Sequence, residues 1–119
     1  MKKILIVEDD KKSLYLARFI LEKKGYEVIE ARDGLEAIDR VSMERPDLIL
    51  MDMQLPKLDG YEATRRIKAD KKSDKIPVVA LTAYAMKGDR EKTLAAGCSG
   101  YIEKPIDPAT FAEEVKKYL

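Results

Sequence analysis

The sequence predicts an α/β fold in which helices cover both faces of a five-stranded parallel sheet. Short apolar runs suited to strands alternate five times with segments of helical periodicity, and such alternation is typical of parallel sheets. A length of 119 residues suits a single compact domain. No internal repeat or linker interrupts the pattern, so we expect residues 1–119 to form one domain around one core.

The composition of the five strands also predicts their order. The first, third and fourth strands are unbroken apolar runs at residues 4–7, 48–51 and 78–81, as expected for strands that are covered on both faces. The second and fifth, at residues 26–31 and 100–104, carry charges and suit the edges of a sheet. The flavodoxin-like order 2-1-3-4-5 satisfies this pattern. It opens a crevice beyond the carboxyl ends of strands one and three.

The first three helices are marked by apolar residues at helical spacing. The first is expected over residues 11–24, with Gly25 as its stop. Asp33 and Asp59, each followed by glycine, are turn signals before the second and third helices. The predicted buried stripes are Leu14, Ala17, Ile20 and Leu21 in the first helix, Leu35, Ala37, Ile38 and Val41 in the second, and Ala63, Thr64 and Ile67 in the third.

The last two helices differ in how clearly the sequence marks them. The fourth, around residues 86–96, has a small apolar face, so we expect it to be the most mobile. The fifth has Asp107 as a predicted N-cap and Pro108 at its first helical position. The predicted apolar positions are Met86, Leu94 and Ala95 in the fourth helix and Phe111, Ala112, Val115 and Leu119 in the fifth.

Composition excludes several classes of function. The 23 basic and 22 acidic residues give a net charge of +1, so no field gathers nucleic acid. The sequence has no histidine, which excludes histidine-based triads, and only one cysteine, Cys98, which excludes internal disulfides. Together these counts exclude Cys/His zinc sites. We expect Cys98 to be a small buried residue rather than a redox centre. The apolar runs are too short to span a membrane and no secretory signal is visible, which predicts a cytoplasmic protein without a membrane anchor.

Charged and hydroxyl side chains follow four of the predicted strands at their carboxyl ends. Glu8 and Asp9 follow the first strand, Asp52 the third, Thr82 the fourth and Lys104 the fifth. A buried carboxylate is costly unless it is paired or bound to a metal, so their recurrence predicts one shared site. Asp10, the third acid of the first run, is instead expected to cap the first helix.

The chemistry of this predicted site suits a phosphoryl group and a hard divalent ion. Clustered carboxylates repel one another, and Mg2+ prefers carboxylate, carbonyl, water and phosphate oxygens. We expect Asp9 and Asp52 to hold the ion, with Glu8 acting through water. Asp52 could then attack phosphorus as a carboxylate nucleophile, while Lys104 and Thr82 compensate the phosphoryl oxygens.

Four motifs, IVEDD, LILMDMQLPKLDG, VVALTA and YIEKPI, resemble the CheY-like receiver domain of bacterial two-component response regulators over essentially the whole chain. Residues 77–106 are also similar to single-domain regulators of the DivK type and to receivers of hybrid kinases. The resemblance implies that a sensor histidine kinase or a histidine phosphotransfer protein donates a phosphoryl group with Mg2+, for which Mn2+ can substitute. The residues that match the family's functional positions are the acidic pair Glu8 and Asp9, the phospho-acceptor Asp52, Gln54 with its backbone carbonyl on the metal, the switch pair Thr82 and Tyr101, and Lys104 with its cis bond to Pro105.

The resemblance also implies a two-state switch. These residues contain no output domain, so we expect the effect to pass by docking to another protein, unless the chain is cut from a longer one. Thr82 moves toward the new phosphoryl group and Tyr101 turns inward, which changes a surface formed by helix four, strand five and helix five. A downstream protein would dock there. Tyr101 could instead be simple edge packing, and Tyr84 either gates water access to the phosphoryl group or has no such role.

Two other functions remain as alternatives to this signalling role. A phosphatase of the haloacid dehalogenase type also uses a strand-end aspartate with Mg2+, but it needs a second acid where this chain has Gln54. A pseudo-receiver that docks without taking phosphate is disfavoured by the intact Asp9, Asp52, Thr82 and Lys104. We therefore expect a regulatory phospho-acceptor rather than a metabolic enzyme.

Overall fold

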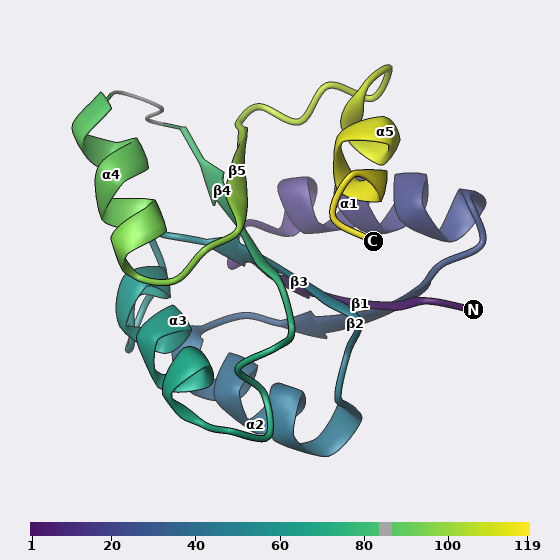
Figure 1. The fold of residues 1–119 in the computed structure, drawn as a ribbon. Coiled ribbons are helices and arrows are strands. Elements are labelled where there is room, and N and C mark those ends of the chain that lie inside the picture. Colours follow the sequence, from purple (N-terminus) through teal and green to yellow (C-terminus); the bar gives the residue numbers. More distant parts are fainter. Residues whose placement is uncertain (84–86) are drawn as a thin grey trace.

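Five parallel strands form a single sheet in the order β2-β1-β3-β4-β5, as predicted. The structure is a computed structural model that describes residues 1–83 and 87–119. Figure 1 shows strands and helices alternating along the chain. The strands are β1 (Lys3–Val7), β2 (Glu27–Ala31), β3 (Leu48–Asp52), β4 (Val78–Thr82) and β5 (Gly100–Glu103), and the helices are α1 (Lys11–Lys23), α2 (Gly34–Glu44), α3 (Gly60–Ala69), α4 (Lys87–Ala95) and α5 (Phe111–Lys116).

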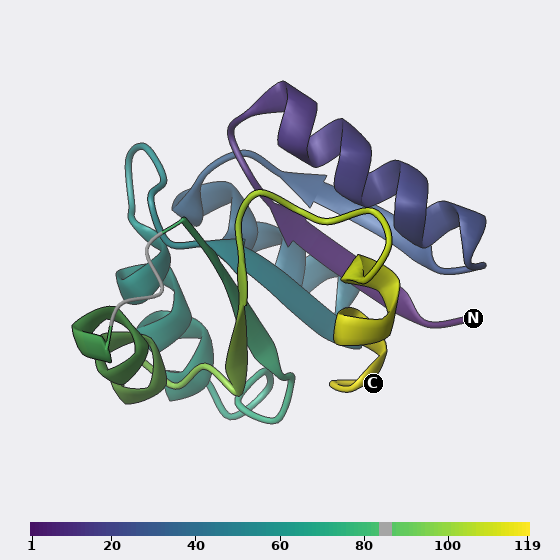
Figure 2. The ribbon, with the colours of Figure 1, turned by 90° about the horizontal axis from the view of Figure 1, so that it is seen from above.

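Two apolar clusters, one on each face of the sheet, make up the core. Side chains alternate between the faces along each strand, so that Ile4 and Ile6 join one cluster while Leu5 and Val7 join the other. The first cluster also contains buried residues of α1 and α5, and the second those of α2 and α3. Figures 1 and 2 show these helix pairs on opposite faces, with α4 beside the β5 edge.

Aspartates begin the first three helices. The side chains of Asp10, Asp33 and Asp59 each accept a hydrogen bond from a backbone amide in the first turn of α1, α2 or α3, which satisfies donors that the helix leaves unpaired. At the other end of α1, Gly25 has a φ of 93°, a conformation that favours glycine. The predicted cap at Asp10 and the predicted stop at Gly25 are therefore confirmed, while Asp33 and Asp59, which were predicted only as turn signals, also cap their helices.

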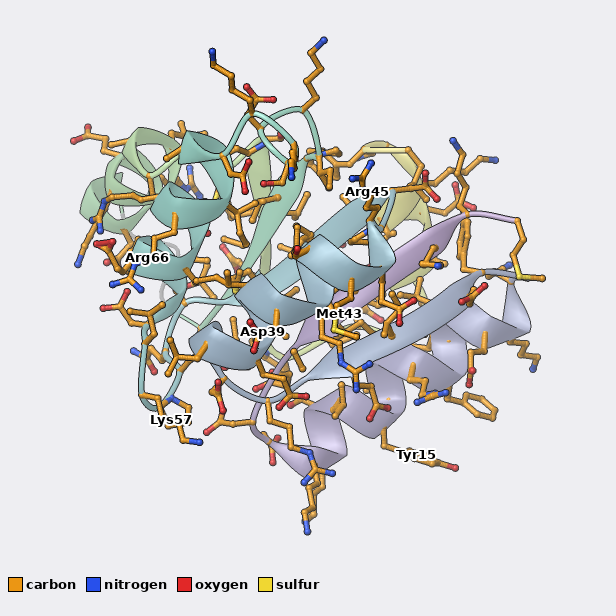
Figure 3. All side chains as sticks on the ribbon, turned by 90° about the horizontal axis from the view of Figure 1, so that it is seen from below. Tyr15, Asp39, Met43, Arg45, Lys57 and Arg66 are labelled. Carbon is orange, nitrogen blue, oxygen red and sulfur yellow. The ribbon has the colours of Figure 1, made fainter. Side chains whose placement is uncertain are left out.

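The buried stripes of the helices were predicted only in part. Leu35 was expected in the buried stripe of α2 but is 48% exposed, whereas Ala37 and Val41 are buried as predicted. One position out of phase on a helix is enough to turn a side chain toward water. Figure 3 shows Asp39 and Met43 on the outer surface of α2, and Met43 is 76% exposed.

The predictions for α4 and α5 need correction. Leu94 is 55% exposed and Ala95 is also exposed, while Met86 lies outside the described residues. Helix α5 begins at Phe111 rather than at Pro108. The side chain of Asp107 accepts a hydrogen bond from the Ala109 amide at 2.9 Å and so closes a separate turn before the helix.

Within the described residues, no helix is long and apolar enough to cross a membrane. The longest of them, α1, has 13 residues, and a span needs about 20 apolar residues in succession. The Cys98 side chain is buried, as predicted, and burial raises its pKa to about 11. A thiol with that pKa stays protonated at neutral pH and is a poor nucleophile.

Two glycines let the loop after β3 pack against its neighbours. A Cβ on Gly34 would lie 2.1 Å from the carbonyl oxygen of Leu58, and one on Gly60 would lie 2.4 Å from that of Asp52. Both distances are far below van der Waals contact, so only glycine fits. Gly60 also donates its amide to the Met53 carbonyl at 3.1 Å, which fixes the backbone just beyond the end of β3.

Replacing Gly34 should destabilise the fold by disturbing this loop. We expect Gly34→Ala to lower the free energy of unfolding by about 1 to 3 kcal/mol, because the new methyl group meets backbone atoms that are not free to move aside. Leu35→Ala is the matched control, since its side chain is largely exposed, and it should change stability by less than about 0.5 kcal/mol. Chemical denaturation measures both values. Equal stability of Gly34→Ala and wild type would contradict the role given to this close approach.

Candidate functional site

The carboxyl ends of β1, β3, β4 and β5 meet around one pocket. Backbone hydrogen bonds hold these ends together, from the Met53 amide to the Leu81 carbonyl at 3.3 Å and from the Lys104 amide to the Thr82 carbonyl at 2.8 Å. The pocket has a volume of about 270 Å³. It lies where sheet order reverses between β1 and β3, the usual place for a ligand site in this architecture. Its lining includes Glu8, Asp9, Asp52, Gln54, Thr82 and Lys104.

Asp52 is the last residue of β3, and its carboxylate is held at both oxygens. Oδ1 accepts a hydrogen bond from the backbone amide of Gln54 at 3.0 Å, and Oδ2 accepts one from Lys104 Nζ at 3.2 Å. The residue is only 6% exposed. These contacts fix the direction of the carboxylate and leave its remaining lone pairs facing the pocket.

Glu8 is a buried acid that pairs with the same lysine. It is 1% exposed, and its Oε1 forms an ion pair with Lys104 Nζ. Its Oε2 accepts a hydrogen bond from the Asp10 amide at 3.2 Å. The pKa of Glu8 is raised from 4.5 to about 7, first because burial disfavours the carboxylate and next because of its hydrogen bond with Asp52, while Lys104 opposes the rise.

Lys104 remains charged despite its partial burial. Burial lowers the pKa of its ammonium group, but the hydrogen bond to Glu8 and the charges of Asp52 and Glu8 outweigh this effect and raise the pKa overall. Its side chain is 18% exposed. The peptide bond between Lys104 and Pro105 is cis, as the resemblance of the YIEKPI motif predicted.

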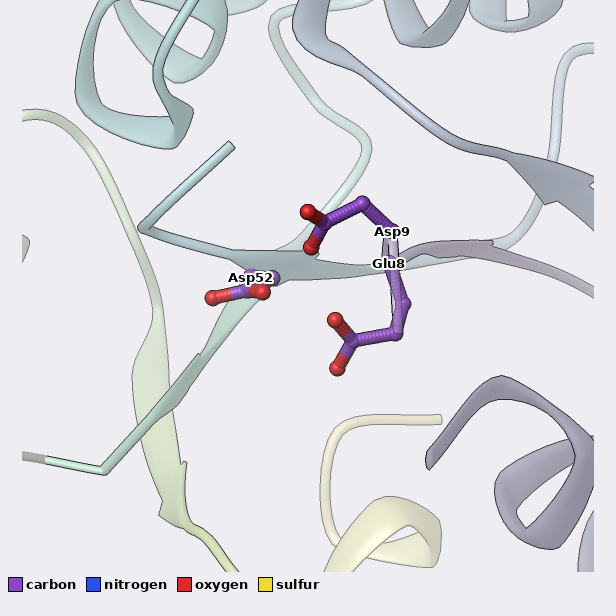
Figure 4. A group of neighbouring side chains, drawn as sticks. All are labelled: Glu8, Asp9 and Asp52. Carbon is purple, nitrogen blue, oxygen red and sulfur yellow. The ribbon is translucent and has the colours of Figure 1, made fainter. Parts of the chain in front are cut away.

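The three acids are close enough to share one cation. One carboxylate oxygen from each of Glu8, Asp9 and Asp52 can be chosen so that all lie within 4.8 Å of one another, and Figure 4 shows the side chains turned toward a common space. Asp9 is exposed, whereas the other two acids are buried. Among the described residues that line the pocket, Lys104 carries the only positive charge beside these carboxylates. A donor set of hard oxygens fits Mg2+.

The remaining predicted residues lie near this cluster. Thr82 ends β4, is 9% exposed and lines the pocket. Tyr101 in β5 pairs in register with Ala80 and packs on the same face of the sheet, the face to which strand alternation also assigns Thr82. Gln54 contributes its amide to Asp52, and the metal-binding role of its carbonyl stays a prediction. Tyr84 lies outside the described residues.

Sequence reasoning missed two sets of contacts around the site. The pairing of Glu8 with Lys104 was not predicted, although both residues were assigned to the site. The second set joins α4 to two aromatic rings. Arg90 lies over the Tyr101 ring, with 5.0 Å between Cζ and the ring centroid, and Lys92 lies over the Tyr61 ring, with 4.2 Å between Nζ and the ring centroid. The lack of an apolar stripe in α4 was the signal that other contacts must hold this helix.

Comparison with known proteins supports a family assignment over nearly the whole chain. The sequence profile of the response regulator receiver domain matches residues 4–116. The polar-differentiation response regulator DivK of Brucella anthropi is 49% identical over 118 residues, which cover 99% of this chain and 96% of that protein.

Solved structures are also similar to this fold. The chemotaxis response regulator CheY4 of Vibrio cholerae has a TM-score of 0.95 at 28% identity, covering 100% of this chain and 99% of that one. The receiver domain of the sensor histidine kinase PA1611 from Pseudomonas aeruginosa has a TM-score of 0.90 at 39% identity, and the match covers 98% of this chain and 96% of that one. That structure has a magnesium ion coordinated in its active-site cleft. This chain therefore belongs to the response regulator receiver domain family, the regulatory phosphorelay proteins of two-component systems.

Proposed function

We propose that Asp52 is the phospho-acceptor of this receiver and that residues 1–119 act as one receiver domain. The observation that carries the proposal is the environment of the Asp52 carboxylate, which is fixed by the Gln54 backbone amide and by Lys104 and faces a pocket that Glu8 and Asp9 also line. The donor is the phosphohistidine of a sensor histidine kinase or of a histidine phosphotransfer protein. The product is a regulatory acyl phosphate that water later removes.

The transfer exchanges one bond to phosphorus for another. A carboxylate oxygen of Asp52 attacks the phosphorus atom in line, and the bond between phosphorus and the donor nitrogen breaks, with its electron pair leaving on the imidazole. Lys104 already donates to Asp52 and can donate to the phosphoryl oxygens as negative charge spreads over them. The protein thus supplies position and charge for its own phosphorylation and dephosphorylation.

The acids that face Asp52 give the site its metal preference. Asp9 and Asp52 would hold Mg2+ directly, Glu8 would act through water and Gln54 would offer its carbonyl, with Mn2+ as a substitute. When bound, the ion neutralises carboxylate and phosphoryl charge. Supporting this set, one carboxylate oxygen from each of Glu8, Asp9 and Asp52 lies within 4.8 Å of the other two.

The signal passes from the phosphoryl group to the surface through Thr82 and Tyr101. Thr82 would bring its hydroxyl to a phosphoryl group on Asp52, and its position in the lining of the same pocket supports this role. Tyr101 then turns toward the space that Thr82 leaves, and the phosphoryl group shifts the populations of two conformations. We place the docking surface for a downstream protein on α4, β5 and α5. The proposal includes a cytoplasmic location and no direct contact with nucleic acid.

Two alternatives make different predictions from this proposal. A haloacid dehalogenase-type phosphatase would turn over phosphoesters, yet the position two residues after Asp52 is Gln54, whose side-chain amide is too weak an acid to act as a general acid. A pseudo-receiver would dock without any phosphoryl transfer. Treatment with acetyl phosphate separates all three. The proposed acceptor accumulates a covalent phosphoryl group, a phosphatase hydrolyses the reagent in repeated turnovers, and a pseudo-receiver does neither.

Asp52 should be the single phosphorylation site and should require a divalent metal. With acetyl phosphate and Mg2+, we expect intact-mass spectrometry to show one added phosphoryl group on wild type. Asp52→Asn should show none, because an amide is not a nucleophile of this kind. Wild type in EDTA should also gain none.

Asp59→Asn is a matched control for the loss of a carboxylate in the same loop region. Asp59 caps α3 through its Oδ1, and asparagine is also a good cap, so this variant should be phosphorylated like wild type. Full phosphorylation of Asp52→Asn would show that another residue accepts the phosphoryl group.

Mg2+ should stabilise the protein more at pH 8 than at pH 5.5. The pKa of Glu8 in the folded protein is raised to about 7, so between about pH 4.5 and pH 7 the folded protein holds a proton that the unfolded chain has lost. The protonated Glu8 therefore contributes to stability at low pH, and this contribution is lost as the pH rises through 7. Mg2+ at a hundred times its Kd should add about 2.7 kcal/mol, and competition with protons reduces that gain at pH 5.5.

Thermal unfolding with and without Mg2+ at the two pH values measures this effect. In the metal-free protein, Glu8→Gln should remove the part of the pH dependence that comes from Glu8, because glutamine does not titrate. Asp9→Asn should lose most of the rise in melting temperature with Mg2+ at pH 8. An equal rise in Asp9→Asn and wild type would rule out the acidic cluster as the metal site.

A further inference from the structure

We propose that Arg90 is a positioning residue for the switch, which holds the Tyr101 ring in its present place through a cation–π contact. The inference rests on the proposed function, in which Tyr101 turns toward Thr82 after phosphorylation. Arg90 thereby sets how strongly the protein favours its unphosphorylated conformation. Neither the resemblance to the family nor the acidic site assigns any role to this arginine.

The contact between Arg90 and Tyr101 is close, and among the described residues no carboxylate forms an ion pair with Arg90. The guanidinium carbon lies 5.0 Å from the ring centroid, within the range of about 6 Å for an attractive cation–π contact. In residues 1–83 and 87–119, Arg90 forms no ion pair with a carboxylate. Arg90 is exposed, whereas Tyr101 is half-buried and packs against the apolar cluster on that face of the sheet.

The way in which α4 is held makes this contact important. Between Asp89 and Ala96, only Thr93 and Ala96 are buried, and so apolar burial fixes the helix weakly. Its other aromatic contact, Lys92 over Tyr61, connects α4 to α3. Arg90 connects α4 to β5, so the orientation of one ring on β5 is coupled to the position of the helix.

An inward turn of Tyr101 must withdraw the ring from Arg90. An interaction that exists in one conformation and is lost in the other shifts the equilibrium toward the first by its own free energy. For an exposed cation–π contact this corresponds to a factor of about two to five in population. By linkage, the same factor appears in the affinity for anything that binds the switched conformation more tightly.

The experiment uses beryllofluoride with Mg2+ as a phosphoryl analogue and follows the ring and amide chemical shifts of Tyr101. We expect Arg90→Met to bind beryllofluoride about two to five times more tightly than wild type. In the free variant, the Tyr101 signals should already have moved part of the way toward their bound positions. Arg90→Lys, which keeps a cation on the helix, should restore most of the wild-type behaviour.

Lys92→Met is the matched control, because it removes a cation–π contact of the same helix without touching Tyr101. It should leave both the affinity and the Tyr101 signals unchanged. The inference is overturned if Arg90→Met keeps wild-type affinity and free-state shifts while wild type binds beryllofluoride normally. Equal effects of Arg90→Met and Lys92→Met would also overturn it, since they would indicate a general loosening of α4. Failure of wild type to bind beryllofluoride would instead refute the proposed function, and the inference with it.

Discussion

Lys104 extends from the end of β5 to two carboxylates on different strands, Glu8 after β1 and Asp52 at the end of β3. Both acids are buried, and a buried carboxylate without a partner is costly. One ammonium group supplies a single positive charge to this pair, while Asp9 adds a third acid within 4.8 Å. Burial, and next the hydrogen bond with Asp52, raise the pKa of Glu8 against the opposing effect of Lys104. The excess of carboxylates over ammonium charge in this cluster fits the site to a divalent cation.

The fold supports this cluster by fixing backbone rather than by enclosing it. Parallel strands bring their carboxyl ends to one edge, and the order reversal between β1 and β3 leaves that edge open. Gly34 and Gly60 allow the loop after Asp52 to pack closely on α2 and β3. Helix α4 is held differently, because few of its described residues are buried and cation–π contacts connect it to Tyr101 of β5 and to Tyr61 of α3. Backbone and side-chain contacts thus fix the proposed acceptor, while the proposed readout surface is held by contacts that are easier to exchange.

Strand order and the location of the site were predictable because they follow from composition and topology. Unbroken apolar runs marked the central strands, charged runs marked the edges, and strand-end acids marked the site. The first turn of α5 was wrongly predicted because Asp107 also suits a turn that closes before a helix, and local sequence does not distinguish the two. Pairing of Glu8 with Lys104 depends on side-chain reach across the sheet. The contact of Arg90 with Tyr101 depends on the rotation of α4, which a helix without an apolar stripe does not reveal.

The central claim is that the charge cluster around Lys104 is a metal-dependent acceptor site centred on Asp52. A crystal structure of the protein with Mg2+ and beryllofluoride tests it most directly. The account predicts beryllofluoride bonded to a carboxylate oxygen of Asp52, a metal ion in contact with Asp9 and Asp52, and Lys104 Nζ on a fluorine atom. A beryllofluoride group bound elsewhere, or a cluster in which Lys104 still pairs with both Glu8 and Asp52 and no metal ion is present, would contradict it.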